Sequence, residues 1–250
     1  MPTAHLNYVL RLADNALVLG QRLSEWCGHA PVLEEDLALA NIALDLIGQA
    51  RLLLTHAGQL EGQGRDEDQF AFLRQQDQYC NVTLVELPNG DFGHTVGRNL
   101  LYSAFQQELW HALLDSQDRE LAAIAEKGLK ETRYHLRHSA DWVVRLGDGT
   151  EESHQHMQAA LDELWPYTAE FFTADTVDDE VSAVGIGPAW HTLESAWEAA
   201  VVPVLKQATL SIPQRTGFRS RGKVGVHSEH LGHLLAEMQY LQRAYPDNRW

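Results

Sequence analysis

Cysteine is scarce in this chain, which has only Cys27 and Cys80 among its 250 residues. Two cysteines are too few for a disulfide framework, so the small disulfide-stabilised secreted domains are excluded as a class. The two also lack the C-x-x-C spacing of zinc and redox sites. We expect both to be reduced thiols packed in the interior, because free cysteine is among the most buried residue types.

Long apolar runs are missing as well, since apolar residues never continue for the roughly 18 positions that a membrane-spanning helix requires. Near the N-terminus, Arg11 and Asp14 interrupt the apolar residues before a segment long enough for the core of a signal peptide has formed. We therefore expect a cytoplasmic protein without a membrane partner.

Basic residues are few in comparison with acidic ones. Lys and Arg total 19 against 35 Asp and Glu, which gives a formal net charge of -16. A chain of this charge repels a nucleic-acid backbone and an anionic bilayer. Nucleic acid is therefore not expected as a partner.

The residues that are present follow a helical pattern along nearly the whole chain. In residues 5–26 the apolar positions are spaced by three and four, as on the buried face of an amphipathic helix. No alternating strand pattern competes with this interpretation, and residues 174–188 are expected to form a long acidic connection. The predicted helices are 5–26, 34–59, 67–86, 92–115, 118–146, 151–173, 188–207 and 228–244.

Long helices joined by short turns predict an all-α fold, namely an up-and-down four-helix bundle with additional peripheral helices. The expected core consists of the helices at 5–26, 34–59, 92–115 and 118–146. Residues 151–250 would supply accessory helices and a C-terminal arm. We predict one domain over 1–250.

Bundles of this kind can hold carboxylate-bridged di-iron centres, with one Glu from each of two helices and Glu-x-x-His from each of the other two. The second predicted helix has Asp45 and Gly48 where Glu and His are needed, so it has a shorter carboxylate and no imidazole. The helix at 118–146 has Glu131 followed by Tyr134 at the third position and His135 at the fourth. Glu131 and His135 could coordinate a metal or form a hydrogen bond across one turn.

The helix at 92–115 contains a literal match, Glu108-Leu-Trp-His111, with Glu108 on the apolar stripe. A match this short is weak because a chain with 35 acids and 13 histidines produces several by chance. A dense group of His and Glu also follows position 226, where a solvated helix face is the preferred interpretation. No four helices supply a complete ligand set.

Five long segments carry a resemblance to a known family. They are RLADNALVLGQRLSEWCGHAPVLEEDLALANIALDLIGQARLLL (11–54), VELPNGDF (85–92), KETRYHLRHSADWVVRLGDGT (130–150), SAWEAAVVPVLKQATLSIPQ (195–214) and HSEHLGHLLAEMQYLQR (227–243). In this order they closely resemble the structural C subunits of bacterial phenylacetyl-CoA epoxidase (ring 1,2-epoxidase) complexes, within the phenylacetic acid catabolic protein family.

The resemblance implies a ferritin-like fold and a non-catalytic, structural subunit of a multicomponent oxygenase that epoxidises the aromatic ring of phenylacetyl-CoA in aerobic phenylacetate degradation. The family's A subunit houses the di-iron centre, and a reductase subunit supplies electrons from NADPH. This chain would pair with A, and possible further partners are other small subunits. It would bind no cofactor or metal and would not be an enzyme by itself. The degenerate ligand positions are then Asp45, Gly48, Glu108, Glu131, Tyr134 and His135.

Two alternatives stay open at this point. The chain could be a self-sufficient di-iron carboxylate oxidoreductase acting on an acyl-CoA, with ligands that the sequence does not reveal. It could also be an acyl-CoA binding module built on the same bundle.

A basic segment at 214–227 stands out in this acidic protein, since it contains no acid and the four cations Arg215, Arg219, Arg221 and Lys223. Three glycines predict a loop or an arm rather than a packed element. The segment is either a solvated charge cluster or a contact for an anionic partner. Among anionic groups, an acidic face of the partner subunit is favoured over the phosphates of coenzyme A.

The aromatic residues Trp165, Tyr167, Trp190 and Trp197 are expected in the core. Exposure of these side chains would instead indicate an interface.

Overall fold

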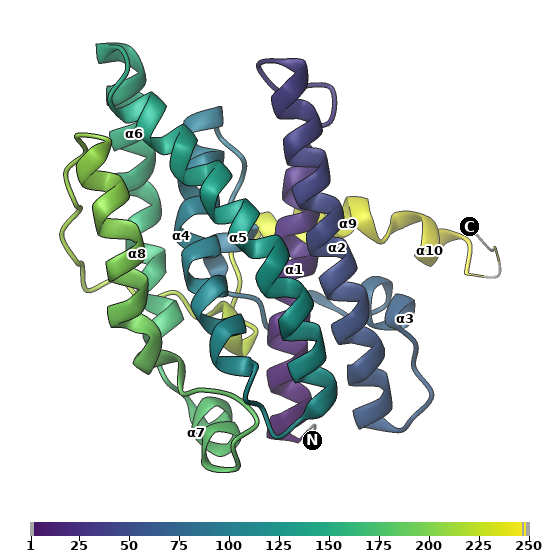
Figure 1. Ribbon diagram of the computed structural model, residues 1–250. Coiled ribbons are helices and arrows are strands. Elements are labelled where there is room, and N and C mark those ends of the chain that lie inside the picture. The colour runs from purple at the N-terminus through teal and green to yellow at the C-terminus, as the bar shows by residue number, and fades with distance from the viewer. Residues whose placement is uncertain (1–2, 247, 249–250) are drawn as a thin grey trace. The chain divides into compact units, whose positions relative to one another are not determined.

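The computed structural model describes residues 3–246 and 248, and it is all-α, as predicted (Figure 1). No β-strand occurs among these described residues, in which Arg221 and Val226 form an isolated antiparallel bridge. The α-helices are α1 Ala4–Ser24, α2 Leu33–Glu61, α3 Glu67–Phe72, α4 Phe92–Leu113, α5 Arg119–Gly147, α6 Glu151–Leu164, α7 Thr176–Ala183, α8 Glu194–Gln207, α9 Glu229–Met238 and α10 Tyr240–Ala244. Short 3-10 helices cover Gln76–Gln78, Thr83–Glu86, Trp165–Phe172, Trp190–Leu193 and Gly222–Val224.

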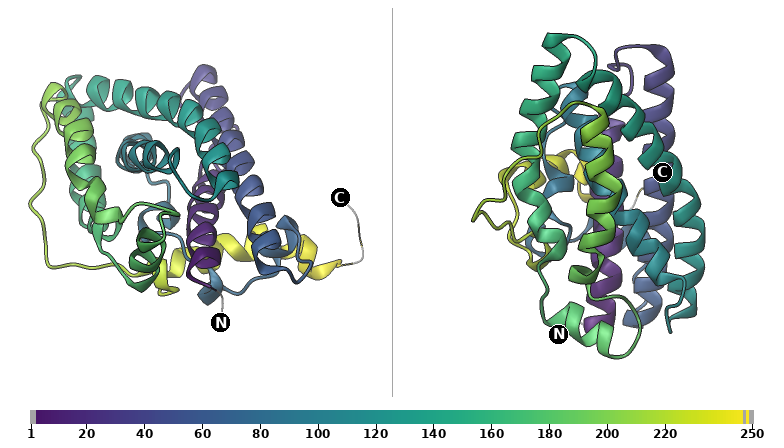
Figure 2. Two further views of the ribbon diagram at one scale, coloured as in Figure 1. Left: turned by 60° about the horizontal axis from the view of Figure 1, so that its bottom comes forward. Right: turned by 60° about the vertical axis from the view of Figure 1, so that its left-hand side comes forward.

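The helices form two compact units, which we describe separately. Unit 1 consists of Met1–Pro88 and Ser220–Trp250, and unit 2 consists of Asn89–Arg219. Each unit is built around one pair of long helices joined by a short turn, α1 with α2 and α4 with α5 (Figure 1; Figure 2). That these two pairs associate into one four-helix bundle, in a single domain, stays a prediction from the sequence.

In unit 1, α1 and α2 pack closely along their length. The predicted apolar face of α1 is buried, and α2 contributes Leu39, Leu46 and Leu53 from one side. The helices approach closely at Gly20, where a Cβ atom would lie 3.0 Å from Ile47 Cγ1. A glycine at this position therefore sets how near the two helices can come.

The predicted helix over 67–86 is wrong, because a buried arginine ends α3 early. Only Glu67–Phe72 is α-helical, followed by 3-10 turns. The guanidinium of Arg74 donates to the Phe70 carbonyl (2.6 Å) and the Gln78 carbonyl (3.0 Å), and it forms a buried ion pair with Asp14. Because the side chain takes the carbonyl that a continuing helix would use, the chain leaves the helix here.

A second buried carboxylate, that of Glu86, forms hydrogen bonds that hold the C-terminal arm of unit 1 in place. Glu86 accepts from Asn81 Nδ2 (2.9 Å), His227 Nδ1 (2.8 Å) and the backbone N–H of Ser228 (2.6 Å). The Nε2 of His227 lies 2.9 Å from the Tyr79 carbonyl. Both ring nitrogens of His227 thus face acceptors, so the ring satisfies both only as the doubly protonated imidazolium.

The helix of the C-terminal arm begins at the predicted position but does not continue as predicted. Ser228 is its N-cap residue, although the Ser228 side chain makes no capping hydrogen bond. The predicted helix to 244 is interrupted at Gln239, whose side-chain amide donates to the carbonyls of Ala71 (3.2 Å) and Arg74 (3.1 Å). This break separates α9 from α10.

In unit 2, α4 packs against α5 and the later aromatic residues. A Cβ at Gly128 of α5 would lie 2.9 Å from Trp110 Nε1, so the indole rests directly on the glycine. Phe105 stacks on Phe171 with ring centroids 4.6 Å apart, and Trp197 donates to the Leu101 carbonyl (2.9 Å). The core positions predicted for Trp165, Trp190 and Trp197 are confirmed, whereas Tyr167 is half-buried.

Two other expectations were wrong. The predicted connection at 174–188 contains α7, which begins because Asp175 accepts from the backbone N–H groups of Val177 and Asp178. Cys27 is exposed and Cys80 is half-buried, so these thiols are not packed in the interior as expected. Cys27 lies in the turn between α1 and α2 rather than on a packed helix face.

Among the described residues, one helix, α2, is long and apolar enough to cross a membrane by length and composition. Half of its most apolar window is buried inside the structure, and core helices of globular proteins pass the same test of length and composition.

The Glu86–His227 pair predicts a pH-dependent stability. Burial alone lowers the pKa of His227, but the hydrogen bond and charge of Glu86 and the Tyr79 carbonyl outweigh it and leave the pKa raised above 6.5. The pair therefore stabilises the fold fully below the unfolded pKa, and this contribution is lost as pH rises through the raised folded pKa. Breaking a buried pair costs about 3 kcal/mol or more.

We expect His227→Gln to reduce the free energy of unfolding by about that amount at pH 6 and by less at pH 9, measured by urea denaturation. His230→Gln, on the neighbouring helix turn, serves as the control and leaves the pH profile unchanged. Parallel pH profiles for wild type and His227→Gln would contradict the assignment.

Candidate functional site

The first degenerate ligand pair, Asp45 and Gly48, lies in the middle of α2. Both residues are half-buried. A Cβ atom built on Gly48 meets no atom within 4 Å, so the space beside this position is open. Gly48 therefore offers no ligand atom, and its lack of a side chain is not required by packing within the described chain.

The second set lies on α4 and α5 of unit 2. Glu108 and Glu131 are half-buried, and Glu131 lies 3.4 Å from Lys127 Nζ in an ion pair within the same helix. His135 is 1% exposed, whereas Tyr134 is 38% exposed and stacks in a tilted arrangement on His138. The side chain at the position where Glu-x-x-His needs an imidazole therefore reaches the surface.

These residues do not fit a di-iron group of the expected kind. Each Glu-x-x-His arm needs a carboxylate and an imidazole three positions apart. The α2 arm lacks the imidazole at Gly48, and the α5 arm has the phenol of Tyr134 in its place. A phenol and a glycine supply no nitrogen donor, so the ligand set is incomplete in each unit considered alone.

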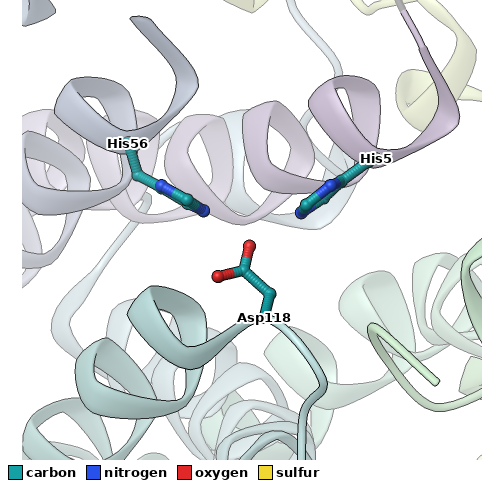
Figure 3. A group of neighbouring side chains, drawn as sticks. All are labelled: His5, His56 and Asp118. Atoms are coloured by element: carbon teal, nitrogen blue, oxygen red, sulfur yellow. The ribbon is translucent and has the colours of Figure 1, made fainter. Parts of the chain in front are cut away.

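Two histidines of unit 1 offer a partial donor set elsewhere. His5 of α1 and His56 of α2 turn their rings toward each other, with centroids 6.1 Å apart in an edge-to-face arrangement (Figure 3). Two imidazoles are half of the ligands of a tetrahedral zinc site. Asp118, drawn in the same view, belongs to unit 2, where its carboxylate caps α5 by accepting from the backbone N–H groups of Glu120 and Leu121.

The basic segment is divided between the units, because the boundary falls after Arg219. In unit 2, Arg215 is exposed but forms ion pairs with Glu194 (2.6 Å) and Glu198 (2.8 Å), which raise the pKa of its guanidinium. Arg219 donates to the carbonyls of Thr216 (3.0 Å) and Phe218 (2.7 Å). The positive charge of Arg215 is thus largely satisfied within the chain.

In unit 1 the same segment is a loop, as expected, although it contains the short 3-10 helix Gly222–Val224 and the centre of the loop is packed. Gly222 and Lys223 are buried, and a Cβ at Gly222 would lie 2.3 Å from the Asn81 carbonyl oxygen. Of the unit 1 cations in this segment, Arg221 is exposed. Contact of Arg215, Arg219, Arg221 or Lys223 with a partner or an anion stays a prediction.

A small cavity lies beside the unit 2 part of the segment. It has a volume of about 190 Å³, with an aromatic wall and both acidic and basic groups at its margin. Its main lining residues are Trp165, Phe172, Glu194, Trp197, Arg215 and Arg219. This volume is below the roughly 300 Å³ at which sites for small-molecule ligands begin, so the cavity is too small for an acyl-CoA.

Sequence reasoning missed the buried carboxylate pairs. His227 stood out only as one of several histidines after position 226, and Glu86 did not stand out at all. The two residues are separated by 141 positions, so only tertiary structure brings them together. Asp14 and Arg74 were missed for the same reason.

Comparison with known proteins identifies the family. The family model described as phenylacetic acid catabolic protein matches residues 1–250. The chain belongs to this family. A relative from Escherichia coli (strain K12), the C subunit of 1,2-phenylacetyl-CoA epoxidase, is 54% identical over 243 residues, which cover 97% of this chain and 98% of the relative. The resemblance predicted from the five segments is confirmed, and the helical fold is consistent with the ferritin-like bundle expected for the family.

The incomplete donor set yields a prediction. We expect Asp45→Glu combined with Gly48→His to leave the purified chain without two tightly held irons, because the α5 arm still lacks its imidazole at position 134. Iron content is measured by elemental analysis after anaerobic loading with Fe²⁺.

The triple variant that adds Tyr134→His is the comparison for iron content, since it completes both Glu-x-x-His sequences. Position 134 is 38% exposed, so this replacement does not disturb the core. Two irons per chain in the double variant alone would show that the ligand positions have been misidentified.

Proposed function

We propose that this chain is a non-catalytic, structural subunit of a multicomponent oxygenase that epoxidises the aromatic ring of phenylacetyl-CoA in phenylacetate degradation. The observation that carries the proposal is the 54% identity to the C subunit of an epoxidase over nearly the full length of both chains. An identity this high over nearly the whole of both chains indicates a shared architecture and not merely a shared local motif.

The donor chemistry supports the non-catalytic part of the proposal. A di-iron oxygenase needs nitrogen and carboxylate ligands from four helices. In this chain Gly48 and Tyr134 stand at the two imidazole positions. The acids of the set, Asp45, Glu108 and Glu131, are half-buried, and Glu131 forms an ion pair with Lys127.

In this proposal the chemistry resides in other subunits. The di-iron A subunit activates dioxygen, a reductase subunit supplies electrons from NADPH, and other small subunits complete the complex. In this proposal the chain binds neither iron nor NADPH. It works in the cytoplasm, with no nucleic acid or membrane as a partner. Its contribution is a second helical body that pairs with A and supports the active subunit.

Iron analysis and co-purification test the proposal. Co-expressed with a tagged A subunit, the chain is expected to co-purify in stoichiometric amount, and the isolated chain is expected to hold far fewer than two irons. Turnover of phenylacetyl-CoA is expected only when A and the reductase are also present.

Two results would favour the other functions. Two tightly held irons and turnover by the isolated chain would establish a self-sufficient di-iron oxidoreductase. Tight binding of a coenzyme A ester by the isolated chain, measured by calorimetry, without any association with A, would establish an acyl-CoA binding module.

A further inference from the structure

One helix of unit 1 carries an exposed row of leucines. On α2, Leu33 is 72% exposed, Leu37 58%, Leu44 65% and Leu52 38%. Single exposed apolar side chains are ordinary on a protein surface. Four leucines on one helix, together with the adjoining Val32 at 50%, form an exposed apolar row in which the polar side chains of Asn41 and Arg51 are also exposed.

The exposed leucines form one stripe opposite the packed side of α2. At about 100° per residue, Leu33, Leu37, Leu44 and Leu52 lie within an arc of about 100°. The buried leucines at 39, 46 and 53 lie roughly on the opposite side of the helix, facing α1. The helix thus has two apolar faces, and α1 covers one of them, which explains why its sequence is apolar almost all the way round.

Because Gly48 has no side chain, it leaves a shallow depression in the middle of the exposed stripe. It lies one turn after Leu44 and one turn before Leu52, and a Cβ atom there would meet nothing within 4 Å. Leu44 and Leu52 flank this gap along the helix, and Asp45 and Arg51 lie at its sides. A side chain of an approaching helix can enter the gap as a knob enters a hole. The stripe spans about 20 residues, or about 29 Å along the helix axis, which is the length of a full partner helix.

The border of the stripe is acidic. Glu34 and Asp36 lie in the first turn of α2, and Asp45 lies near its centre. Arg51, which lies within the arc of the stripe itself, is already paired with Glu67 at 3.3 Å. A complementary surface therefore presents an apolar helix face bordered by Lys or Arg.

We propose that the Leu33–Leu52 stripe of α2 is the docking surface for a helix of the di-iron A subunit, with Gly48 receiving a partner side chain. This inference rests on the proposed function, which supplies the partner. A second copy of the chain is disfavoured because each copy carries a net charge of -16 and the same acidic border. An anionic bilayer is disfavoured by the same charges.

The test measures the affinity of the full chain for the A subunit. Leu37→Glu combined with Leu44→Glu is expected to weaken binding at least ~100-fold, because two leucines that bury fully on binding become charges facing an apolar helix. Glu and Leu have similar helix propensities, and both sites are exposed, so the thermal unfolding midpoint is expected to stay within a few degrees of wild type.

The matched control is Leu73→Glu combined with Leu241→Glu. These leucines are 50% and 46% exposed, lie in the same unit and receive the same change in charge, but they lie outside α2. The control is expected to bind A as wild type does. Equal loss in both variants would show a general charge effect and overturn the proposal.

Gly48→Trp tests the gap itself. The open space beside Gly48 lets the indole be accommodated in the isolated chain, but it occupies the place of the partner side chain. We expect at least a tenfold loss of affinity for A with an unchanged unfolding midpoint. Wild-type affinity in both Gly48→Trp and the Leu37/Leu44 variant would overturn the assignment of the surface.

The outcomes separate this inference from the proposed function. A wild-type chain that fails to bind A contradicts the proposed function, whereas binding that the α2 variants do not change contradicts only the docking surface. A wild-type chain that forms homodimers, or binds vesicles of phosphatidylglycerol, in a way that Leu37→Glu/Leu44→Glu abolishes would assign the stripe to another occupant and overturn the proposal.

Discussion

The buried carboxylate of Glu86 is the constraint on which the architecture of unit 1 depends. It receives hydrogen bonds from Asn81, His227 and the backbone of Ser228, so it joins residues that precede and follow the whole of unit 2 in sequence. Arg22 reinforces the junction by donating to the carbonyls of Glu86 and His230 (both 3.0 Å). A carboxylate without these partners would be costly to bury, which is why the arm and the hairpin of α1 and α2 are ordered together.

The parts of the fold that follow from local periodicity could be predicted from the sequence. The long helices have stripes that repeat every three or four residues, and their predicted bounds lie within about two residues of the observed ones. The region 67–86 could not be predicted this way, because the end of α3 depends on Arg74, which Asp14 anchors from 60 positions away. The packing of Lys223 likewise depends on a contact between Gly222 and Asn81 that no local pattern encodes.

The candidate site was predictable in its chemistry but not in its surroundings. The sequence showed that Asp45 and Gly48 cannot replace Glu and His, since this needs only the side-chain identities. It did not show that the space beside Gly48 is open, or that Leu37 and Leu44 face solvent. A helix that is apolar all round is normally expected to be buried all round, and only the position of α1 reveals which half stays uncovered.

Residues of α2 connect the lost ligand to the proposed interface. A position that holds no metal ligand can be glycine, and a glycine between exposed leucines permits another helix to approach closely. The chain and its proposed di-iron partner could then share one fold, which is used for metal binding in the partner and for subunit contact in this chain. In the proposed arrangement, the polar residues of the partner's helix would serve the metal, and the apolar residues of α2 in this chain would serve the contact. The acidic border beside the stripe adds selectivity, because it penalises a second copy of the same chain more than it penalises a partner with basic flanks.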